Sequence, residues 1–327
     1  MAKSMVGFDI GVSELKAAIW DGRRVKRIIT APTPENLVKD GIIVSYEAMA
    51  DFIKESLKRS HAPGLCAVIL PSNYVFIRRF NMQNMTKAQL EVNLPYEFKD
   101  FLTQSKDRYF FDYAVNNVVE EEDGTYLDLL AACVGKDVIS DYRNMFRRAG
   151  FKLAVAVPAE AAYLDIIRAQ PHIEDVNFCF ADFGCSATRL VIFNGAGYEV
   201  SRNMDIGVRT MCEAIAKYYG VDEPMARGYL LENRENCQEL PELQSIYNTI
   251  AVEIRKAVSF YAFSSGKGAV EDLWCCGGGS HIDAFMRTVE EGTGLRLKPV
   301  TQLLPPVPDN SNPMSAAAAI GAVMQGG

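Results

Sequence analysis

An Asp-x-Gly-x-Ser pattern occurs twice in this chain, and both copies stand in one register. Residues 9–13 read DIGVS and residues 182–186 read DFGCS. The likeness continues to Asp21-Gly22 after the first copy and to Asn194-Gly195 after the second. Every matched position is displaced by 173 residues, as 182 is from 9 and 195 from 22. The matched pair predicts a duplicated unit whose halves face each other across a cleft.

Each copy has the pattern of a strand, a tight turn, a returning strand and a second turn. Apolar runs lead into each aspartate at residues 6–8 and 178–181, and further apolar runs follow at 17–20 and 190–193. Asp-Gly and Asn-Gly are favoured two-residue hairpin turns. We therefore expect a strand hairpin around each motif.

The turn residues of both copies suit a phosphate group. Gly11 and Gly184 let the backbone approach a ligand closely, because glycine has no Cβ. Successive N–H groups in such a turn form a concave anion site. Ser13, Ser186 and Thr188 would add hydroxyl donors. The alternative is an ordinary hairpin, since Asp-x-Gly is common in turns.

Charged side chains accompany the two turns. Asp9 and Asp182 would hold Mg²⁺, which binds through one or two carboxylates, water and substrate phosphates. Lys16 would neutralise phosphate charge if its side chain faces the cleft. Together with Glu160, the two aspartates are the candidates for a catalytic role, although no residue is an evident activator of a nucleophile.

A third glycine-rich loop fits the same site. An apolar run at residues 273–276 leads into Gly277, Gly278, Gly279 and Ser280, and a helical pattern follows. Three glycines at a strand-to-helix junction let the backbone approach a flat ring or a phosphate beside a helix N-terminus. The alternative is a crowded crossing of a strand and a helix.

Composition excludes several classes of protein. The 327 residues suffice for about two domains. The net charge of −7 argues against a nucleic-acid groove, and no apolar run approaches the roughly 20 residues of a membrane span. The eight cysteines and three histidines show no metal or disulfide spacing. With no apolar signal-peptide segment, we expect a cytoplasmic protein with reduced cysteines.

The chain divides into four segments by pattern. Residues 1–72 and 151–176 form a first lobe, and residues 73–150 form a small α+β insertion. Residues 177–206 and 268–327 form a second lobe, and residues 207–267 form a helical subdomain. A small-residue helix over residues 315–322 suits close packing against a sheet.

The two Asp-x-Gly turns and the Gly-Gly-Gly-Ser loop, in this order, resemble the phosphate-1, phosphate-2 and adenosine motifs of the actin/Hsp70/sugar-kinase superfamily. The insertion resembles the type IV pilus assembly protein PilM (competence protein A) family. Its Pro-Tyr at positions 95–96 and Asp112-Tyr113 carry that likeness, with Pro158 to Ala161 and Asn312-Pro313 further along. The resemblance covers essentially the whole chain. The division protein FtsA shares the architecture, but we find no C-terminal membrane-targeting helix of its kind.

The resemblance implies an α/β, actin-like (ribonuclease H-like) fold of two duplicated lobes with an FtsA/PilM-type insertion. It implies ATP and Mg²⁺ bound between the lobes. It also implies a place at the cytoplasmic face of the inner membrane, reached through a protein partner. That partner would be the N-terminal cytoplasmic tail of a PilN-like single-span membrane protein. Other pilus components would follow, with no nucleic acid and no direct membrane insertion, and self-association stays open.

Three positions depart from the family pattern. A second glycine and a threonine are often found where this chain has Val208 and Cys212. The family often has an acidic residue and a lysine where this chain has Arg227 and Leu230. A third departure is Pro158, where an acidic residue is common. The first two weaken purine contacts, and the third removes a carboxylate that would position water.

Three functional alternatives remain at this point. The first is a nucleotide-binding pilus scaffold that is at most a slow ATPase. The second is a small-molecule kinase on the same fold, and no segment stands out as its substrate pocket. The third is a degenerate adaptor that binds no nucleotide and only holds a membrane-protein tail. An FtsA-like cell-division or membrane-tethering protein stays open as an alternative to the pilus scaffold.

Overall fold

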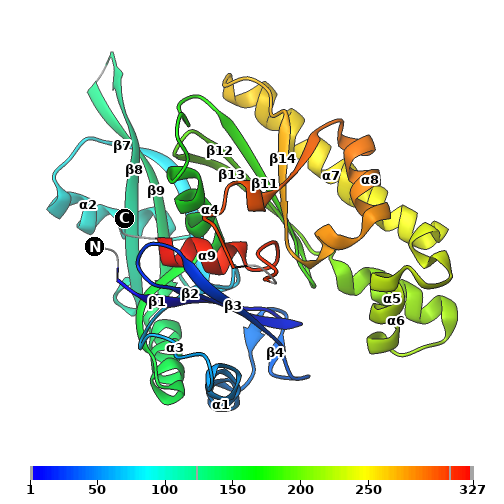
Figure 1. Cartoon of the computed structure of the whole chain (residues 1–327). Coiled ribbons are helices and arrows are strands. Elements are labelled where there is room, and N and C mark those ends of the chain that lie inside the picture. Colours follow the sequence, from blue (N-terminus) through cyan, green and yellow to red (C-terminus); the bar gives the residue numbers. More distant parts are fainter. Residues whose placement is uncertain (1–2, 123, 309–310, 325–327) are drawn as a thin grey trace.

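The computed structural model describes residues 3–122, 124–308 and 311–324, and it is built around two five-stranded sheets (Figure 1). The first sheet has the order β10-β6-β1-β2-β3. Its strands are β1 (Met5–Ile10), β2 (Glu14–Trp20), β3 (Val25–Pro32), β6 (Leu65–Leu70) and β10 (Lys152–Pro158). The predicted outer limits at residues 1 and 327 lie outside the described residues.

The second sheet repeats the first in strand order and direction. Its order is β13-β12-β11-β14-β15. Its strands are β11 (Asn177–Phe183), β12 (Thr188–Asn194), β13 (Gly197–Met204), β14 (Asp272–Cys276) and β15 (Arg296–Pro299). In each sheet three antiparallel strands are followed by two parallel ones. This repetition confirms the predicted duplicated two-lobed fold.

Helices lie outside each sheet and between the two. Outside the first sheet are α1 (Tyr46–Leu57) and α3 (Lys136–Ala149). The second sheet is covered by α5 (Val208–Tyr219), α7 (Pro241–Ser265) and α8 (Asp283–Thr293). Between the sheets lie α4 (Ala159–Arg168) and α9 (Ala317–Met324), whose side chains share one apolar core with inward-facing residues of both sheets (Figure 1).

Backbone contacts at α9 explain its small residues. A Cβ on Gly7 of β1 would overlap the carbonyl of Ala319, and a Cβ on Gly321 would overlap the carbonyl of Ala162 in α4. Strand β1, α9 and α4 therefore pack nearly backbone to backbone. The small-residue helix predicted over 315–322 is present and begins at Ala317.

The insertion forms its own three-stranded sheet beside the two lobes (Figure 1). Its strands are β7 (Val75–Gln83), β8 (Tyr109–Glu121) and β9 (Gly124–Gly135), in the order β7-β9-β8. Helix α2 (Lys87–Asn93) begins with a capping box formed by Thr86 and Gln89.

Helix α3 differs from the predicted division of the chain. The sequence pattern places this helix in the insertion, but the Phe146 ring lies 5.0 Å from the Phe8 ring of β1, and Tyr142 stacks edge-on against Tyr46 of α1. Its apolar face therefore fills the first-lobe core, which argues for a boundary near Gly135. The spacing of apolar residues along α3 could not predict this packing, because an amphipathic pattern shows that one face is buried but not which sheet it packs against.

The remaining elements are short or peripheral. They are β4 (Val38–Lys39), β5 (Ile42–Ile43), α6 (Glu223–Glu232), and the 3₁₀ segments η1 (Leu94–Phe98), η2 (Lys106–Arg108), η3 (Arg234–Glu239), η4 (Gly278–His281) and η5 (Val300–Gln302). Within the described ranges, no helix has both the length and the apolar character that crossing a membrane requires.

Candidate functional site

The two Asp-x-Gly turns have the same backbone geometry. In the first, the Gly11 N–H donates to the Glu14 carbonyl at 3.0 Å, and in the second the Gly184 N–H donates to the Ala187 carbonyl at 3.0 Å. A Cβ at either glycine would lie within 2.9 Å of that same carbonyl oxygen. Only glycine fits such a turn without displacing the returning strand.

Each turn also places a carboxylate opposite a cation. Asp9 of β1 is the cross-strand partner of Lys16 of β2, and Asp182 of β11 is the cross-strand partner of Arg189 of β12. The Lys16 Nζ atom lies 3.2 Å from the Asp9 Oδ2 atom. The duplication therefore extends to the charged side chains.

The charges of the two halves act on each other. Burial lowers the pKa of Lys16, but the negative charges of Asp9 and Asp182 outweigh burial and raise this pKa above its ordinary value. For Arg189, burial again lowers the pKa, and Glu160 followed by Asp182 raises it. The charged groups of the two motifs are thus close enough to act on each other, and both cations stay charged.

Helix α4 adds two side chains to this cluster. The Glu160 Oε1 atom lies 3.7 Å from the Arg189 Nε atom. The Tyr163 hydroxyl donates to Asp182 Oδ2 at 2.9 Å, and burial, followed by the charge of Asp182, raises the pKa of Tyr163 well above its ordinary value. Tyr163 therefore stays protonated and fixes the carboxylate of Asp182.

Sequence reasoning did not include Arg189 or Tyr163 among the site residues. Arg189 could have been found, because it occupies the position equivalent to Lys16 in the second copy. Tyr163 gives no such signal, since an apolar helix position that holds tyrosine is usually core.

The glycine-rich loop lies against the end of β11. Gly277 has a φ of 84°, and a Cβ there would lie 2.5 Å from Asp182 Oδ1 and 2.6 Å from the Phe183 carbonyl oxygen. A Cβ on Gly279 would lie 2.9 Å from the Phe183 Cβ, whereas a Cβ on Gly278 would meet no atom within 4 Å. The loop thus packs on the second motif by its outer glycines and leaves Gly278 beside open space.

The predicted hydroxyl donors fall into two groups. Thr188 is buried and donates to the Ile206 carbonyl at 2.9 Å, and Ser280 donates to the Gly277 carbonyl at 2.6 Å. These two hydroxyls hold the loops together. By contrast, the Ser186 Oγ atom is buried without a hydrogen-bond partner among the described residues. Ser13 lies in the first turn, where its carbonyl accepts from the Thr33 N–H at 3.0 Å.

The positions that depart from the family pattern have different surroundings. At the start of α5, the Val208 N–H donates to the Gly184 carbonyl at 3.1 Å. Cys212 and Leu230 are buried. The Arg227 Nη2 atom of α6 lies 3.9 Å from Glu14 Oε1 of the first turn, so this arginine bridges the lobes. Pro158 stands at the N-terminal cap of α4.

Metal ligands are sparse at the site. Across the residues that the structure describes, no group of three or more Asp, Glu, His or Cys side chains is arranged to hold a metal ion. The duplicated turns supply two carboxylates, Asp9 and Asp182. Two carboxylates suffice for Mg²⁺ only where phosphates and water supply its other ligands.

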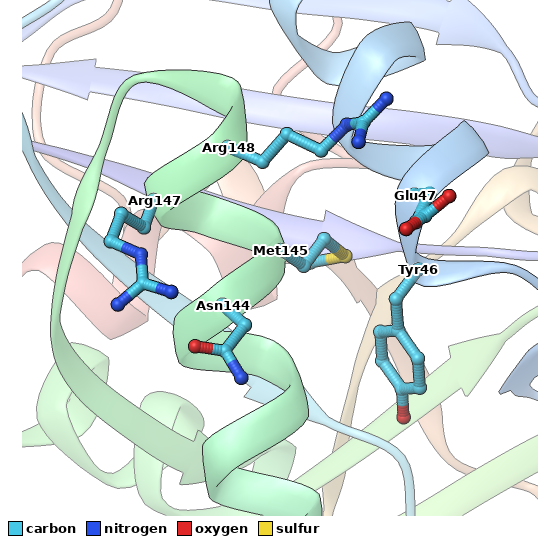
Figure 2. Close-up of a pocket in the computed structure, with 6 residues that line it drawn as sticks. All are labelled: Tyr46, Glu47, Asn144, Met145, Arg147 and Arg148. Atoms are coloured by element: carbon cyan, nitrogen blue, oxygen red, sulfur yellow. The ribbon is translucent and has the colours of Figure 1, made fainter.

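A separate surface cavity lies between α1 and α3 (Figure 2). Its volume is about 430 Å³, and its lining residues are Tyr46, Glu47, Asn144, Met145, Arg147 and Arg148. None of them belongs to the predicted site.

Comparisons with known proteins agree with this architecture. The family model described as "Type IV pilus assembly protein PilM" matches residues 7–306. Among solved structures, a PilM-PilN type IV pilus biogenesis complex matches with a TM-score of 0.86 and 20% identity, covering 100% of this chain and 99% of the other. No curated protein sequence matches.

Two further structures match over most of their length. The ethanolamine utilization protein EutJ from Carboxydothermus hydrogenoformans has a TM-score of 0.61 at 11% identity, covering 100% of this chain and 91% of EutJ. MreB5 of Spiroplasma citri bound to AMPPNP has a TM-score of 0.56 at 12% identity, covering 98% of this chain and 95% of MreB5. At these identities the matches establish the fold, and they confirm the predicted actin-like architecture.

Proposed function

This chain belongs to the type IV pilus assembly protein PilM family, and from that premise we propose that it is an actin-like, nucleotide-binding scaffold of the type IV pilus assembly platform. The observation that carries this proposal is the match to the family over residues 7–306. The structural match to the PilM-PilN complex, over 100% of this chain and 99% of the matched chain, supports it. The FtsA-like alternative has no comparable support.

The nucleotide would bind between the two Asp-x-Gly turns, with its base beside the glycine-rich loop. Ser186 supports the phosphate position, because its buried hydroxyl has no partner in the described part of the chain and a phosphate oxygen would supply one. Gly278 supports the position of the base, because the space beside it is open. In this proposal Gly11, Ser13, Gly184 and Ser186 contact phosphate.

The glycine-rich loop and the remaining hydroxyls would have different roles in this site. Gly277, Gly278 and Gly279 would face the adenosine, and Thr188 and Ser280 would support the loops through their backbone hydrogen bonds.

Mg²⁺ would be held by Asp9 and Asp182 together with phosphate oxygens and water. The cluster holds three carboxylates, Asp9, Asp182 and Glu160, against the two cations Lys16 and Arg189. A triphosphate added to this cluster would leave uncompensated negative charge, which a divalent cation would offset.

Hydrolysis would be slow or absent in this arrangement. Glu160 is the candidate that would orient water, but its carboxylate is next to Arg189 and largely buried. Pro158 offers no carboxylate in its place. Since phosphoryl transfer needs a positioned nucleophile, we propose that the nucleotide acts as a structural ligand that biases the closure of the lobes.

The protein partner would be the cytoplasmic N-terminal tail of a PilN-like membrane protein. An extended tail of this kind can satisfy its backbone at a strand edge and place side chains in pockets. It would hold the chain at the cytoplasmic face of the inner membrane.

One experiment separates the proposed function from its alternatives. Labelled ATP with Mg²⁺ is titrated against the wild type and Asp182→Ala, and phosphate release is followed in parallel. Saturable binding that the substitution abolishes, with negligible release, supports the scaffold. Sugar-dependent turnover would instead support a kinase, and no saturable binding would support an adaptor.

The partner is tested separately with a synthetic peptide of the cytoplasmic start of a PilN-like protein. The peptide should bind the isolated protein, with or without nucleotide. Failure in both forms would contradict the pilus function.

A further inference from the structure

A second cavity lies where the insertion meets both lobes. Its volume is about 330 Å³, and three segments line it. The insertion contributes Arg79, Asn116 and Asp128, and α4 contributes its C-terminal residue, Arg168. The second lobe contributes Glu199 of β13 and Lys267, which follows α7.

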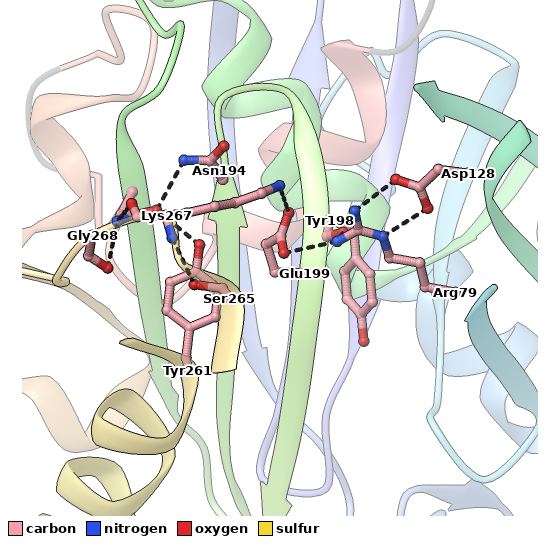
Figure 3. A network of polar contacts seen from close by, with 10 residues as sticks. Arg79, Asp128, Asn194, Tyr198, Glu199, Tyr261, Ser265, Lys267 and Gly268 are labelled. Atoms are coloured by element: carbon pink, nitrogen blue, oxygen red, sulfur yellow. Dashed lines mark hydrogen bonds and ion pairs between the residues drawn. The ribbon is translucent and has the colours of Figure 1, made fainter. Parts of the chain in front are cut away.

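The wall of this cavity is a chain of ion pairs (Figure 3). The Arg79 Nε and Nη2 atoms donate to the two Asp128 carboxylate oxygens at 2.8 and 2.6 Å. The Arg79 Nη1 atom lies 2.8 Å from Glu199 Oε2, and the Lys267 Nζ atom lies 2.8 Å from Glu199 Oε1. Both carboxylates that line the cavity are therefore engaged by Arg79 and Lys267.

Arg168 also lines the cavity, and it takes no part in this chain of ion pairs. Three cations, Arg79, Arg168 and Lys267, line the cavity against two carboxylates. The Arg168 Nη1 atom pairs with Asp165 Oδ1 of the same helix at 3.5 Å, and Asp165 does not line the cavity. Half of the Arg168 side chain is exposed, so its guanidinium can turn toward a ligand.

Asn116 adds an unsatisfied donor to the same cavity. The register between β8 and β9 shifts between Val115 and Asn117, so Asn116 interrupts the alternation of the strand. Its Nδ2 atom is buried and has no hydrogen-bond partner among the described residues. Such a donor carries a desolvation cost until an acceptor reaches it.

We propose that this cavity is a binding site for a small organic or inorganic anion, whose carboxylate or phosphate oxygens accept from Arg168 and Asn116. Charge-assisted hydrogen bonds of this kind are among the strongest available to a polar pocket. The volume lies at the lower end of ligand pockets, about 300–1,000 Å³. The polar lining selects a hydrophilic ligand.

Helix α4 links the cavity to the charged residues between the lobes. Glu160 and Tyr163 near the start of this helix contact the charge cluster between the lobes, and Arg168 at its end lines the cavity. A ligand on Arg168 therefore contacts the same rigid helix that fixes Asp182. The existence of the site does not depend on nucleotide binding, so it is tested without nucleotide.

Calorimetric titration with two probes tests the proposal, inorganic phosphate in one arm and succinate in the other. We expect saturable binding of at least one probe, and the arm that binds identifies the source of the anionic group. Binding should weaken at least tenfold in Arg168→Gln and in Asn116→Leu. Arg147→Gln, which removes an arginine from the cavity between α1 and α3, should bind as the wild type does.

Hydrogen exchange locates the bound probe. Protection should appear in β8 around Asn116 and in the 194–197 turn, and thermal unfolding should show that both variants fold. The proposal is overturned by the absence of saturable binding in both arms, or by unchanged binding in Arg168→Gln and Asn116→Leu. Protection confined to the turns at 11–13 and 184–186 would equally overturn it. Failure here leaves the ATP titration unaffected, because that test uses a different ligand and Asp182→Ala.

Discussion

The Arg79 Nη1 atom lies 2.8 Å from Glu199 Oε2, and this ion pair joins the insertion to the second lobe. The same guanidinium donates to the Tyr198 carbonyl at 2.9 Å and to both oxygens of Asp128. The Asp128 and Glu199 side chains are only 8% and 9% exposed. The hydrogen bond to Asp128 raises the pKa of Arg79, so the guanidinium stays charged in this largely buried network.

Replacing Arg79 with methionine should destabilise the protein strongly. The substitution leaves Asp128 and Glu199 buried without this cation, and breaking a buried pair from one side costs about 3 kcal/mol. Urea unfolding measures the loss, and hydrogen exchange should show it first in β7 and β13.

Arg148→Met is the matched control. Its pair with Asp51 is 2.9 Å long but 49% and 61% exposed, and exposed pairs contribute little to stability, so we expect a much smaller loss. Equal losses in the two variants would show that the Arg79 network does not join the insertion to the second lobe energetically.

Removing the charge of Lys16 should weaken nucleotide binding. In Lys16→Met, Asp9 and Asp182 lose the cation whose pKa they raise, and a triphosphate would meet their charge uncompensated. We expect ATP affinity to fall at least about tenfold, which corresponds to about 1.4 kcal/mol, as measured by titration with labelled ATP.

Lys26→Met controls for the loss of a positive charge. Lys26 pairs with Asp21 at 3.2 Å on an exposed part of β3, and we expect its ATP affinity to match the wild type. An unchanged affinity in Lys16→Met would place the phosphates elsewhere.

The sequence was sufficient to predict the features that repeat. The displacement of 173 positions relates Asp9 to Asp182 and Lys16 to Arg189, and the structure pairs each aspartate with its cation across two strands. Local chemistry fixes these hairpins, because a turn glycine and alternating apolar residues determine the register within a few positions.

The contacts between segments could not be predicted in this way. Arg79 lies 119 positions before Tyr198, whose carbonyl accepts from it, and Glu199 is the next residue. Neither Arg79 nor Glu199 stands in a motif. The packing of α3 on β1 and the bond from Tyr163 to Asp182 are likewise set by tertiary structure. Each requires knowing which faces meet, and a single sequence carries no such information.

Alkaline pH should destabilise the protein through its buried thiols. Burial raises the pKa of Cys66, Cys212 and Cys275 to about 12 in each case, whereas an exposed thiol in the unfolded chain has a pKa of about 8.5. Below the unfolded value both states keep the proton. Above it only the unfolded state loses the proton, so the unfolding free energy falls as pH rises toward about 12.

Urea midpoints at about pH 8 and about pH 10 measure this fall. The triple variant Cys66→Ala, Cys212→Ala, Cys275→Ala should show a smaller difference between the two pH values than the wild type. Its absolute stability is also lower because of the cavities left behind, but that loss does not depend on pH. An identical pH difference in both proteins would contradict the assignment to the thiols.

Alanine at two neighbouring glycines separates the structural from the ligand-binding part of the glycine-rich loop. Gly277→Ala forces a Cβ to within 2.5 Å of Asp182 Oδ1 at a φ of 84°. With a ψ of 169° beside this φ, the backbone conformation is one that essentially only glycine adopts, and it costs another residue about 1–3 kcal/mol, so thermal unfolding should shift clearly downward. In Gly278→Ala the new methyl meets no atom within 4 Å, and stability should be unchanged or slightly higher, because alanine restricts the unfolded chain. The same methyl would occupy the space proposed for adenosine, so ATP affinity should fall while the unfolding temperature does not. Gly278→Ala that binds ATP like the wild type would show that the base does not lie against this loop.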